Sequence, residues 1–175
     1  HDAVLAKIDR EGEHARAGRP ARIIAKMNAL VDPQSIEALY RASRAGVQVD
    51  LIVRGVCALR PGLPGVSDNI RVRSVIGRFL EHSRIFYFEN GGESEMYCAS
   101  ADWMERNFFR RVEVAFPLKR EAHRERILED LQTYLRDDTQ SWQLQKDGVY
   151  THLRSQSETP TNAQSQLLAA YSAIS

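Results

Sequence analysis

The stretch "ARIIAKMNALVDPQSIEALYRASRAGVQVDLIVRG", residues 21–55, decides the fold of this 175-residue chain. Residues 21–28 are a β-rich apolar run of the length expected for a buried strand. Asp32 and Pro33 then place an N-cap residue before a proline at the first helical position, and Gly46 ends that helix. A second apolar strand follows over residues 47–55. This order predicts a βαβ unit with parallel strands and a right-handed crossover.

The patterns on either side of this unit extend it into an α/β fold. The other predicted elements are a helix around residues 4–8, a short strand over 70–77, hairpin strands over Arg84–Phe88 and Glu95–Ala99, a strand over 112–118 and a helix over Glu121–Arg136. Residues 1–154 are expected to form one domain. Residues 155–175 are expected to be a tail, with linker composition first and a short closing helix at "LLAAY".

Composition describes a chain that can build a core. Hydrophobic residues make up 43% and the mean hydropathy is −0.42, while no apolar run approaches the ~20 residues that span a bilayer. Cys57 and Cys98 lack the spacing of a zinc site or a disulfide framework, so no metal site is expected. A cytoplasmic location is expected, with membrane association left open for a longer protein. Because the first residue is His1 and not Met, we expect either a processed chain or a piece of a longer one.

The cations are mostly arginine. Net charge is only +1, which predicts no nucleic-acid partner, yet 20 of the 24 basic residues are Arg. The planar guanidinium fork suits phosphate and carboxylate oxygens. The alternative is that a GC-rich genome encodes Arg in place of Lys.

Polar residues end both strands of the βαβ unit. Lys26 and Asn28 end the first strand, and Arg54 ends the second. Open α/β sheets bind ligands beyond the carboxyl ends of parallel strands, so Arg54, and in a second tier Lys26, are phosphate-binding candidates. The alternative for Arg54 is that it pairs with a nearby carboxylate.

The predicted hairpin brings two further segments together. In an antiparallel pair the entry of one strand lies beside the exit of the next, so His82 and Arg84 should meet Ser100 and Asp102. A histidine beside a carboxylate is suited to general acid–base work. We therefore predict a catalytic His82 with Arg84 and Asp102 in support. The alternative is a strand-end histidine that faces water.

Four motifs carry a family resemblance: "IIAKMNALVD" (23–32), "ALYRASRAGVQVDLIVRGVCALRPGLPGVSDNIRVRS" (38–74), "GRFLEHSRIFYFENGG" (77–92) and "SADWMERNFFRRVEVAFP" (100–117). Together they resemble the last domain of the type 1 polyphosphate kinases, from about Glu13 to His152. The resemblance implies a phospholipase-D-like mixed sheet with flanking helices. It also implies reversible transfer of the γ-phosphoryl group of ATP to polyphosphate through a phosphohistidine.

The resemblance also implies roles for individual residues, and it implies that other parts of the active site lie in another domain. It makes Arg54 a nucleotide-phosphate contact and His82 a second active-site histidine that contacts ATP, whereas Arg84 replaces the Lys of the phospholipase pattern. The phosphorylated histidine and most ligands of the Mg²⁺ that accompanies ATP lie in a preceding domain of the family, which has no counterpart here. We therefore expect this chain alone to be inactive. Its expected partners are ATP or ADP, polyphosphate and the remaining domains, within a homo-oligomeric full-length enzyme.

Two other functions remain open at this point. One is a phospholipase-D-like phosphodiesterase that pairs two copies of His82. The other is a non-catalytic domain that binds phosphate.

Overall fold

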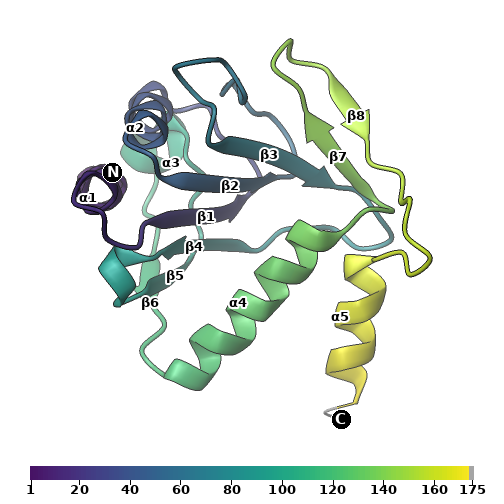
Figure 1. Ribbon diagram of the computed structural model, residues 1–175. Coiled ribbons are helices and arrows are strands. Elements are labelled where there is room, and N and C mark those ends of the chain that lie inside the picture. Colours follow the sequence, from purple (N-terminus) through teal and green to yellow (C-terminus); the bar gives the residue numbers. More distant parts are fainter. Residues whose placement is uncertain (174–175) are drawn as a thin grey trace.

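A mixed β-sheet runs through the part of the molecule that the computed structural model describes, residues 1–173; the last two residues of the predicted tail lie outside it. In these residues eight strands pair in the order β6-β5-β4-β1-β2-β3-β7-β8 (Figure 1). The strands are β1 (Arg22–Met27), β2 (Gln48–Val53), β3 (Ile70–Val75), β4 (Arg84–Phe88), β5 (Glu95–Ala99), β6 (Ala115–Pro117), β7 (Ser141–Leu144) and β8 (Tyr150–His152). The helices are α1 (Asp2–Arg16), α2 (Pro33–Arg44), α3 (Glu105–Arg110), α4 (Glu121–Arg136) and α5 (Ala163–Ser172), with a 3₁₀ turn η1 at Asn90–Gly92.

The βαβ unit is confirmed. Strands β1 and β2 pair in parallel, and β3 adds a third parallel strand beside β2. The Asp32 carboxylate accepts a hydrogen bond of 2.8 Å from the backbone N–H of Ser35, which caps the start of α2. Gly46 adopts a φ of +99° just beyond the end of α2, a conformation that favours glycine.

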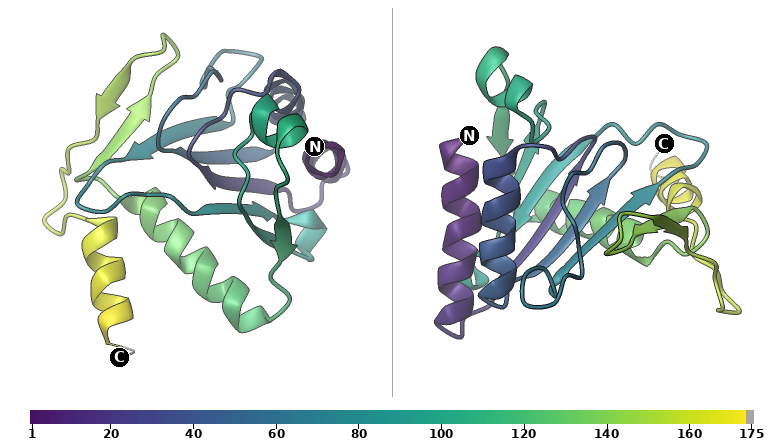
Figure 2. Two further views of the ribbon diagram at one scale, coloured as in Figure 1. Left: turned by 180° about the vertical axis from the view of Figure 1, so that it is seen from behind. Right: turned by 90° about the horizontal axis from the view of Figure 1, so that it is seen from above.

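Helices cover both faces of the sheet. Figure 2 shows α1 and α2 side by side on one face, with α4 and α5 on the other. The side chains of β1 alternate between two cores: Ile23, Ala25 and Met27 face α1 and α2, whereas Ile24 packs in the cluster that includes Leu131 of α4. The predicted mixed sheet with flanking helices is thereby confirmed.

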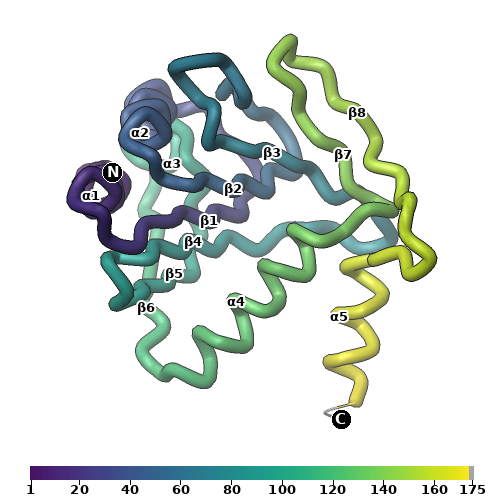
Figure 3. Tube along the Cα trace, viewed as in Figure 1, coloured from purple at the N-terminus to yellow at the C-terminus, as the bar shows by residue number. Residues whose placement is uncertain are grey.

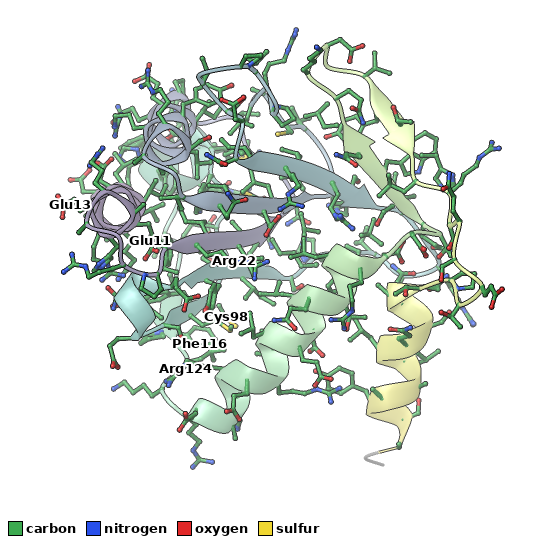
Figure 4. The ribbon with its side chains drawn as sticks, in the orientation of Figure 1. Glu11, Glu13, Arg22, Cys98, Phe116 and Arg124 are labelled. Atoms are coloured by element: carbon green, nitrogen blue, oxygen red, sulfur yellow. The ribbon has the colours of Figure 1, made fainter. Side chains whose placement is uncertain are left out.

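The hairpin of β4 and β5 forms as predicted, in antiparallel register from Arg84↔Ala99 to Phe88↔Glu95. The strand predicted over 112–118 is shorter, because only β6 at Ala115–Pro117 pairs with β5. Figure 4 labels two register partners of this pair, Cys98 and Phe116. Helix α4 occupies the predicted residues.

One helix and one hairpin were not predicted. Helix α3 lies between the predicted strands 95–99 and 112–118, where the sequence analysis predicted no element, and β7 and β8 form a hairpin beyond the predicted helix 121–136. The turn between β7 and β8 contains Asp147 and Gly148, a dipeptide typical of hairpins. This dipeptide could have indicated the hairpin. The flanking strands, however, are short and only about half of their residues are apolar, so they carry no clear strand pattern.

The tail ends in a helix, as predicted, and α5 is longer than the "LLAAY" segment alone. Asn162 caps it by accepting a hydrogen bond from the N–H of Ser165. The backbone N–H of Ala163 donates to the Asp137 carboxylate at 2.7 Å, which ties the start of α5 to the end of α4. The boundary at residue 154 stays a prediction.

Helix α1 is joined to the sheet by a buried carboxylate. Glu11, labelled in Figure 4, is fully buried and accepts hydrogen bonds from the backbone N–H groups of Arg22 and Asn90. Among residues 1–173, no helix combines the length and the apolar character needed to cross a membrane.

Candidate functional site

The ends of β1 and β2 and the start of β4 meet at one edge of the sheet. Parallel pairing sets Met27 opposite Val53, and antiparallel pairing sets Lys26 opposite Ile85. Arg54 therefore follows β2 next to the end of β1, and the segment with His82 enters β4 on the other side of β1. The sequence predicted a common edge for Lys26, Asn28 and Arg54, and the parallel register of β1 and β2 confirms it. The antiparallel pairing of β4 with β1 adds the segment that carries His82 to the same edge.

The predicted meeting of "EHSR" and "SADW" is also confirmed. The Arg84 guanidinium donates two hydrogen bonds to the Asp102 carboxylate, from Nε to Oδ1 at 3.1 Å and from Nη2 to Oδ2 at 3.0 Å. Both side chains are largely buried. A paired fork of this kind sets the position and orientation of both groups. Arg84 therefore holds the two segments together instead of directing its fork outward.

Asn28 links this pair to Arg54. Its backbone N–H and its side-chain amide donate to Asp102 Oδ1 at 2.7 and 3.2 Å, and its Oδ1 accepts from Arg54 Nε at 3.0 Å. The sequence analysis placed Asn28 at the end of the first strand but did not predict it to be a site residue. The available signal was its position two residues beyond Lys26 at the carboxyl edge.

Arg54 keeps its outer nitrogens available. Its Nε is used by Asn28, but within residues 1–173 no group hydrogen-bonds its Nη1 or Nη2. The side chain is half-buried, and the bond from Nε to Asn28 fixes one side of the guanidinium. This arrangement suits a phosphate oxygen.

Asp102 should give the domain a measurable sensitivity to acid. Burial alone would raise the pKa of Asp102, but hydrogen bonds from Arg84 and Asn28 outweigh burial and lower the pKa below its ordinary value of 3.8. Because the folded pKa is lower, its contribution to stability is present above pH 3.8 and is lost as pH falls below it. We expect Asp102→Asn to flatten the pH dependence of the unfolding free energy below pH 4, measured by urea titration. An unchanged slope would contradict this.

Lys26 is directed inward. It is 1% exposed, its Nζ lies 3.0 Å from Glu81 Oε2, and it donates to Ser83 Oγ at 2.8 Å. Burial lowers the pKa of Lys26, Glu81 opposes that change, and the charges of Arg54 and Arg84 lower the pKa further. The strand register places all three cations at this edge of the sheet. Lys26 is occupied by contacts within the protein.

His82 is exposed at the same edge. No residue of 1–173 hydrogen-bonds its ring nitrogens, and its backbone carbonyl accepts from Arg84 Nη1 at 3.3 Å. The Asp102 carboxylate that was expected beside the imidazole is bound by Arg84 and Asn28, because both reach it from strand ends next to it. Ser100, the other expected partner, bonds Glu113 and the N–H of Val114.

A groove of about 600 Å³ opens beside His82. Its walls come from the segment before β4 and from helices α4 and α5, and they include Phe79, Tyr134, Leu168 and Tyr171. The imidazole therefore borders a concave surface that is mostly apolar.

Gly55 lets the two strand ends approach closely. A Cβ atom at this position would lie 2.9 Å from the carbonyl oxygen of Asn28, which is backbone and cannot rotate away. We expect Gly55→Ala to destabilise the domain by about 1–3 kcal/mol. The matched control is Gly12→Ala in α1, where a Cβ would make ordinary contacts from 3.7 Å outward, so its effect should be neutral or stabilising. Denaturant unfolding measures both, and equal effects would contradict the argument.

Two further features of the described residues concern possible metal ligands and the Cys57 thiol. Within 1–173 no group of three or more His, Cys, Asp or Glu side chains is arranged to hold a metal ion. Burial raises the pKa of the Cys57 thiol to about 11, so it is protonated at neutral pH. The site comprises two ion pairs, Lys26–Glu81 and Arg84–Asp102, together with the guanidinium of Arg54 and the exposed imidazole of His82.

Known proteins share both the sequence and this fold. The family described as polyphosphate kinase C-terminal domain 2 matches residues 1–164. A polyphosphate kinase of Xylella fastidiosa is 56% identical over 170 residues, covering 96% of this chain and 24% of the relative. A polyphosphate kinase of Pseudomonas aeruginosa is 55% identical over 166 residues, covering 94% and 24%. The chain thus spans about a quarter of the length of these relatives.

Two solved structures share the fold of this chain. The crystal structure of polyphosphate kinase from Porphyromonas gingivalis matches with a TM-score of 0.94 and 39% identity, covering 99% of this chain and 26% of that one. A phospholipase D family member, Nuc from Salmonella typhimurium, matches with a TM-score of 0.59 and 16% identity, covering 82% and 89%. The second likeness establishes a shared fold only.

Proposed function

This chain belongs to the family of polyphosphate kinase C-terminal domains described as domain 2, and we propose that it supplies half of the active site of an ATP:polyphosphate phosphotransferase. In this proposal Arg54 binds phosphate oxygens of the nucleotide and His82 transfers a proton. The observation that carries the proposal is a guanidinium fork, held by Asn28 with its outer nitrogens unbonded in residues 1–173, at the same sheet edge as an exposed imidazole.

The proposed reaction proceeds in two displacements. The γ-phosphorus of ATP forms a bond to a histidine nitrogen on a preceding domain while its bond to the bridging oxygen breaks, which releases ADP. A terminal oxygen of polyphosphate then attacks that phosphorus as the P–N bond breaks, so the chain grows by one phosphate. Phosphoryl transfer depends mainly on positioning and charge stabilisation. In this proposal Arg54 stabilises negative charge on the phosphate oxygens of the nucleotide. His82 donates a proton to the oxygen that leaves.

We assign no Mg²⁺ ligand to this chain. The described residues offer no cluster of carboxylates for a divalent cation, so a Mg²⁺ that accompanies ATP would take its protein ligands from other domains. When bound, such an ion neutralises charge on the phosphates. Every role proposed here for this chain is carried by its own cations and imidazole.

The proposal extends to the parts that surround this domain. Because the chain spans about a quarter of its relatives, we propose that the phosphorylated histidine lies outside it and that the 175-residue chain alone makes no polyphosphate. Its proposed partners are ATP or ADP, polyphosphate and the remaining domains of the same polypeptide. We also propose that the full-length enzyme is a homo-oligomer.

Arg54 provides the direct test of phosphate binding. In a full-length polyphosphate kinase that carries this domain, Arg54→Ala should lower kcat/KM for ATP by roughly 10- to 100-fold, because a charge-assisted hydrogen bond contributes about 1.5–3 kcal/mol. Arg54→Lys keeps the charge but loses the fork, so it should restore only part of the rate. The matched control is Arg44→Ala, an exposed arginine on α2, which should keep the rate of the unchanged enzyme.

Other outcomes would favour the alternatives. An unchanged kcat/KM in Arg54→Ala would remove Arg54 from the site. Hydrolysis of a bis-ester substrate by the 175-residue chain would favour a phosphodiesterase. Phosphate binding without any kinetic defect in the Arg54 and His82 variants would favour a non-catalytic domain.

A further inference from the structure

The segment that carries His82 is bonded to the C-terminal helix. Between β3 and β4 the chain runs through residues 76–83 without regular secondary structure, and it passes the start of α5 (Figure 3). There the Gln164 side chain accepts from the N–H of Phe79 at 2.9 Å and donates to the C=O of Phe79 at 2.8 Å. One side chain thus pairs both backbone groups of the same residue.

Gln164 holds a second point of this segment. Its Nε2 also donates to Glu81 Oε1 at 2.7 Å, and Glu81 in turn lies 3.0 Å from the buried Lys26. Lys26 donates to Ser83 as well, so the residues on both sides of His82 are tied to the body of the domain. The imidazole lies between two anchored neighbours, and Gln164 provides one of the two anchors.

Packing does not hold this segment in place. Phe79 and Leu80 are 45% and 69% exposed, so the apolar side chains of the segment add little burial. Gln164, in contrast, is only 6% exposed, and its amide is satisfied by this segment. Polar contacts from a buried side chain therefore decide where residues 79–81 lie.

The chain makes room for this contact at Gly77. A Cβ atom there would collide with the side-chain oxygens of Gln140 and Gln164. The start of α5 is itself fixed, because Asp137 at the end of α4 accepts from the N–H of Ala163. The bonds of Gln164 therefore start from a fixed point of the fold.

We propose that Gln164 is a positioning residue for His82, which makes α5 a part of the active-site architecture. The proposal rests on the role of His82 proposed above. Gln164 does not touch substrate; it sets the path of the chain that presents the imidazole. Its loss should lower kcat by roughly 10-fold or more, since small misplacements of reacting groups cost up to about 10²-fold, and should leave KM for ATP nearly unchanged.

The test is a double-mutant cycle in a full-length polyphosphate kinase that carries this domain. The variants are Gln164→Ala, His82→Ala and their combination, with Gln166→Ala as the control because Gln166 is an exposed glutamine on the same helix. If Gln164 acts through His82, its loss should have little further effect once His82 is absent. Hydrogen exchange of residues 77–83 should accelerate in Gln164→Ala and not in Gln166→Ala.

The outcomes separate the two proposals. If His82→Ala lowers kcat but Gln164→Ala does not, the positioning role is wrong and the proposed function stands. An equal loss from Gln164→Ala with and without His82 also overturns the positioning role. If His82→Ala keeps the unchanged rate, the role of His82 itself is wrong. Should Gln164→Ala fail to fold, Gly77→Ala displaces the Gln164 amide while keeping the residue, and wild-type kcat and exchange in that variant would overturn the proposal.

Discussion

Replacing His82 by alanine in a full-length polyphosphate kinase that carries this domain should lower kcat for ATP-dependent polyphosphate synthesis by about 10²-fold or more. The physical reason is that an exposed imidazole, which makes no hydrogen bond with residues 1–173, is free to contact a substrate oxygen and to act as the proton donor in the transition state. The variant should fold normally because the side chain is exposed. The measurement is the steady-state rate of polyphosphate formation at saturating ATP.

A matched histidine controls for general effects of the substitution. His123 is exposed on α4, so His123→Ala should keep the unchanged rate. If His82→Ala also keeps that rate, then His82 is a strand-end histidine that faces water, and the acid–base role in the proposed mechanism is wrong.

Replacing Lys26 by methionine should destabilise the domain by about 3–5 kcal/mol, since removal of one partner leaves the buried charge of the other unpaired. Lys26 is 1% exposed and Glu81 is 8% exposed, so water cannot compensate for the lost ion pair. The second substitution Glu81→Gln removes the remaining charge and keeps an acceptor for Gln164. The double variant should therefore recover most of the lost stability. Urea unfolding of the 175-residue chain measures the difference.

The control for this prediction is Lys146→Met, where the lysine is exposed and the change should stay within about 0.5 kcal/mol. A similar small change in Lys26→Met would mean that the Lys26–Glu81 pair contributes nothing. A double variant less stable than Lys26→Met would mean that the unpaired carboxylate is not the cause of the loss.

Local pattern was sufficient for the central elements. The apolar runs at 21–28 and 47–55, with Asp32 and Pro33 between them, predicted a parallel pair, and the pairing of β1 with β2 confirms it. The same reasoning predicted that "EHSR" and "SADW" meet, because hairpin geometry places a strand entry beside a strand exit. It did not predict α3 or the hairpin of β7 and β8, whose short segments depend on tertiary contacts: β7 pairs with β3, and Phe108 of α3 packs against the core.

The sequence by itself determined the sheet edge at which the candidate residues gather, because strand direction and turn positions follow from periodicity and from residues such as Gly and Pro. Only the tertiary structure decided which of these residues bond to one another and which stay available to a ligand. Arg84 grips Asp102, Lys26 pairs with Glu81, and Arg54 keeps its outer nitrogens unbonded in residues 1–173. Such choices depend on which groups come within about 3 Å of each other, and sequence spacing does not encode that distance across separate strands and helices. Gln164 reaches Phe79 across 85 positions for the same reason.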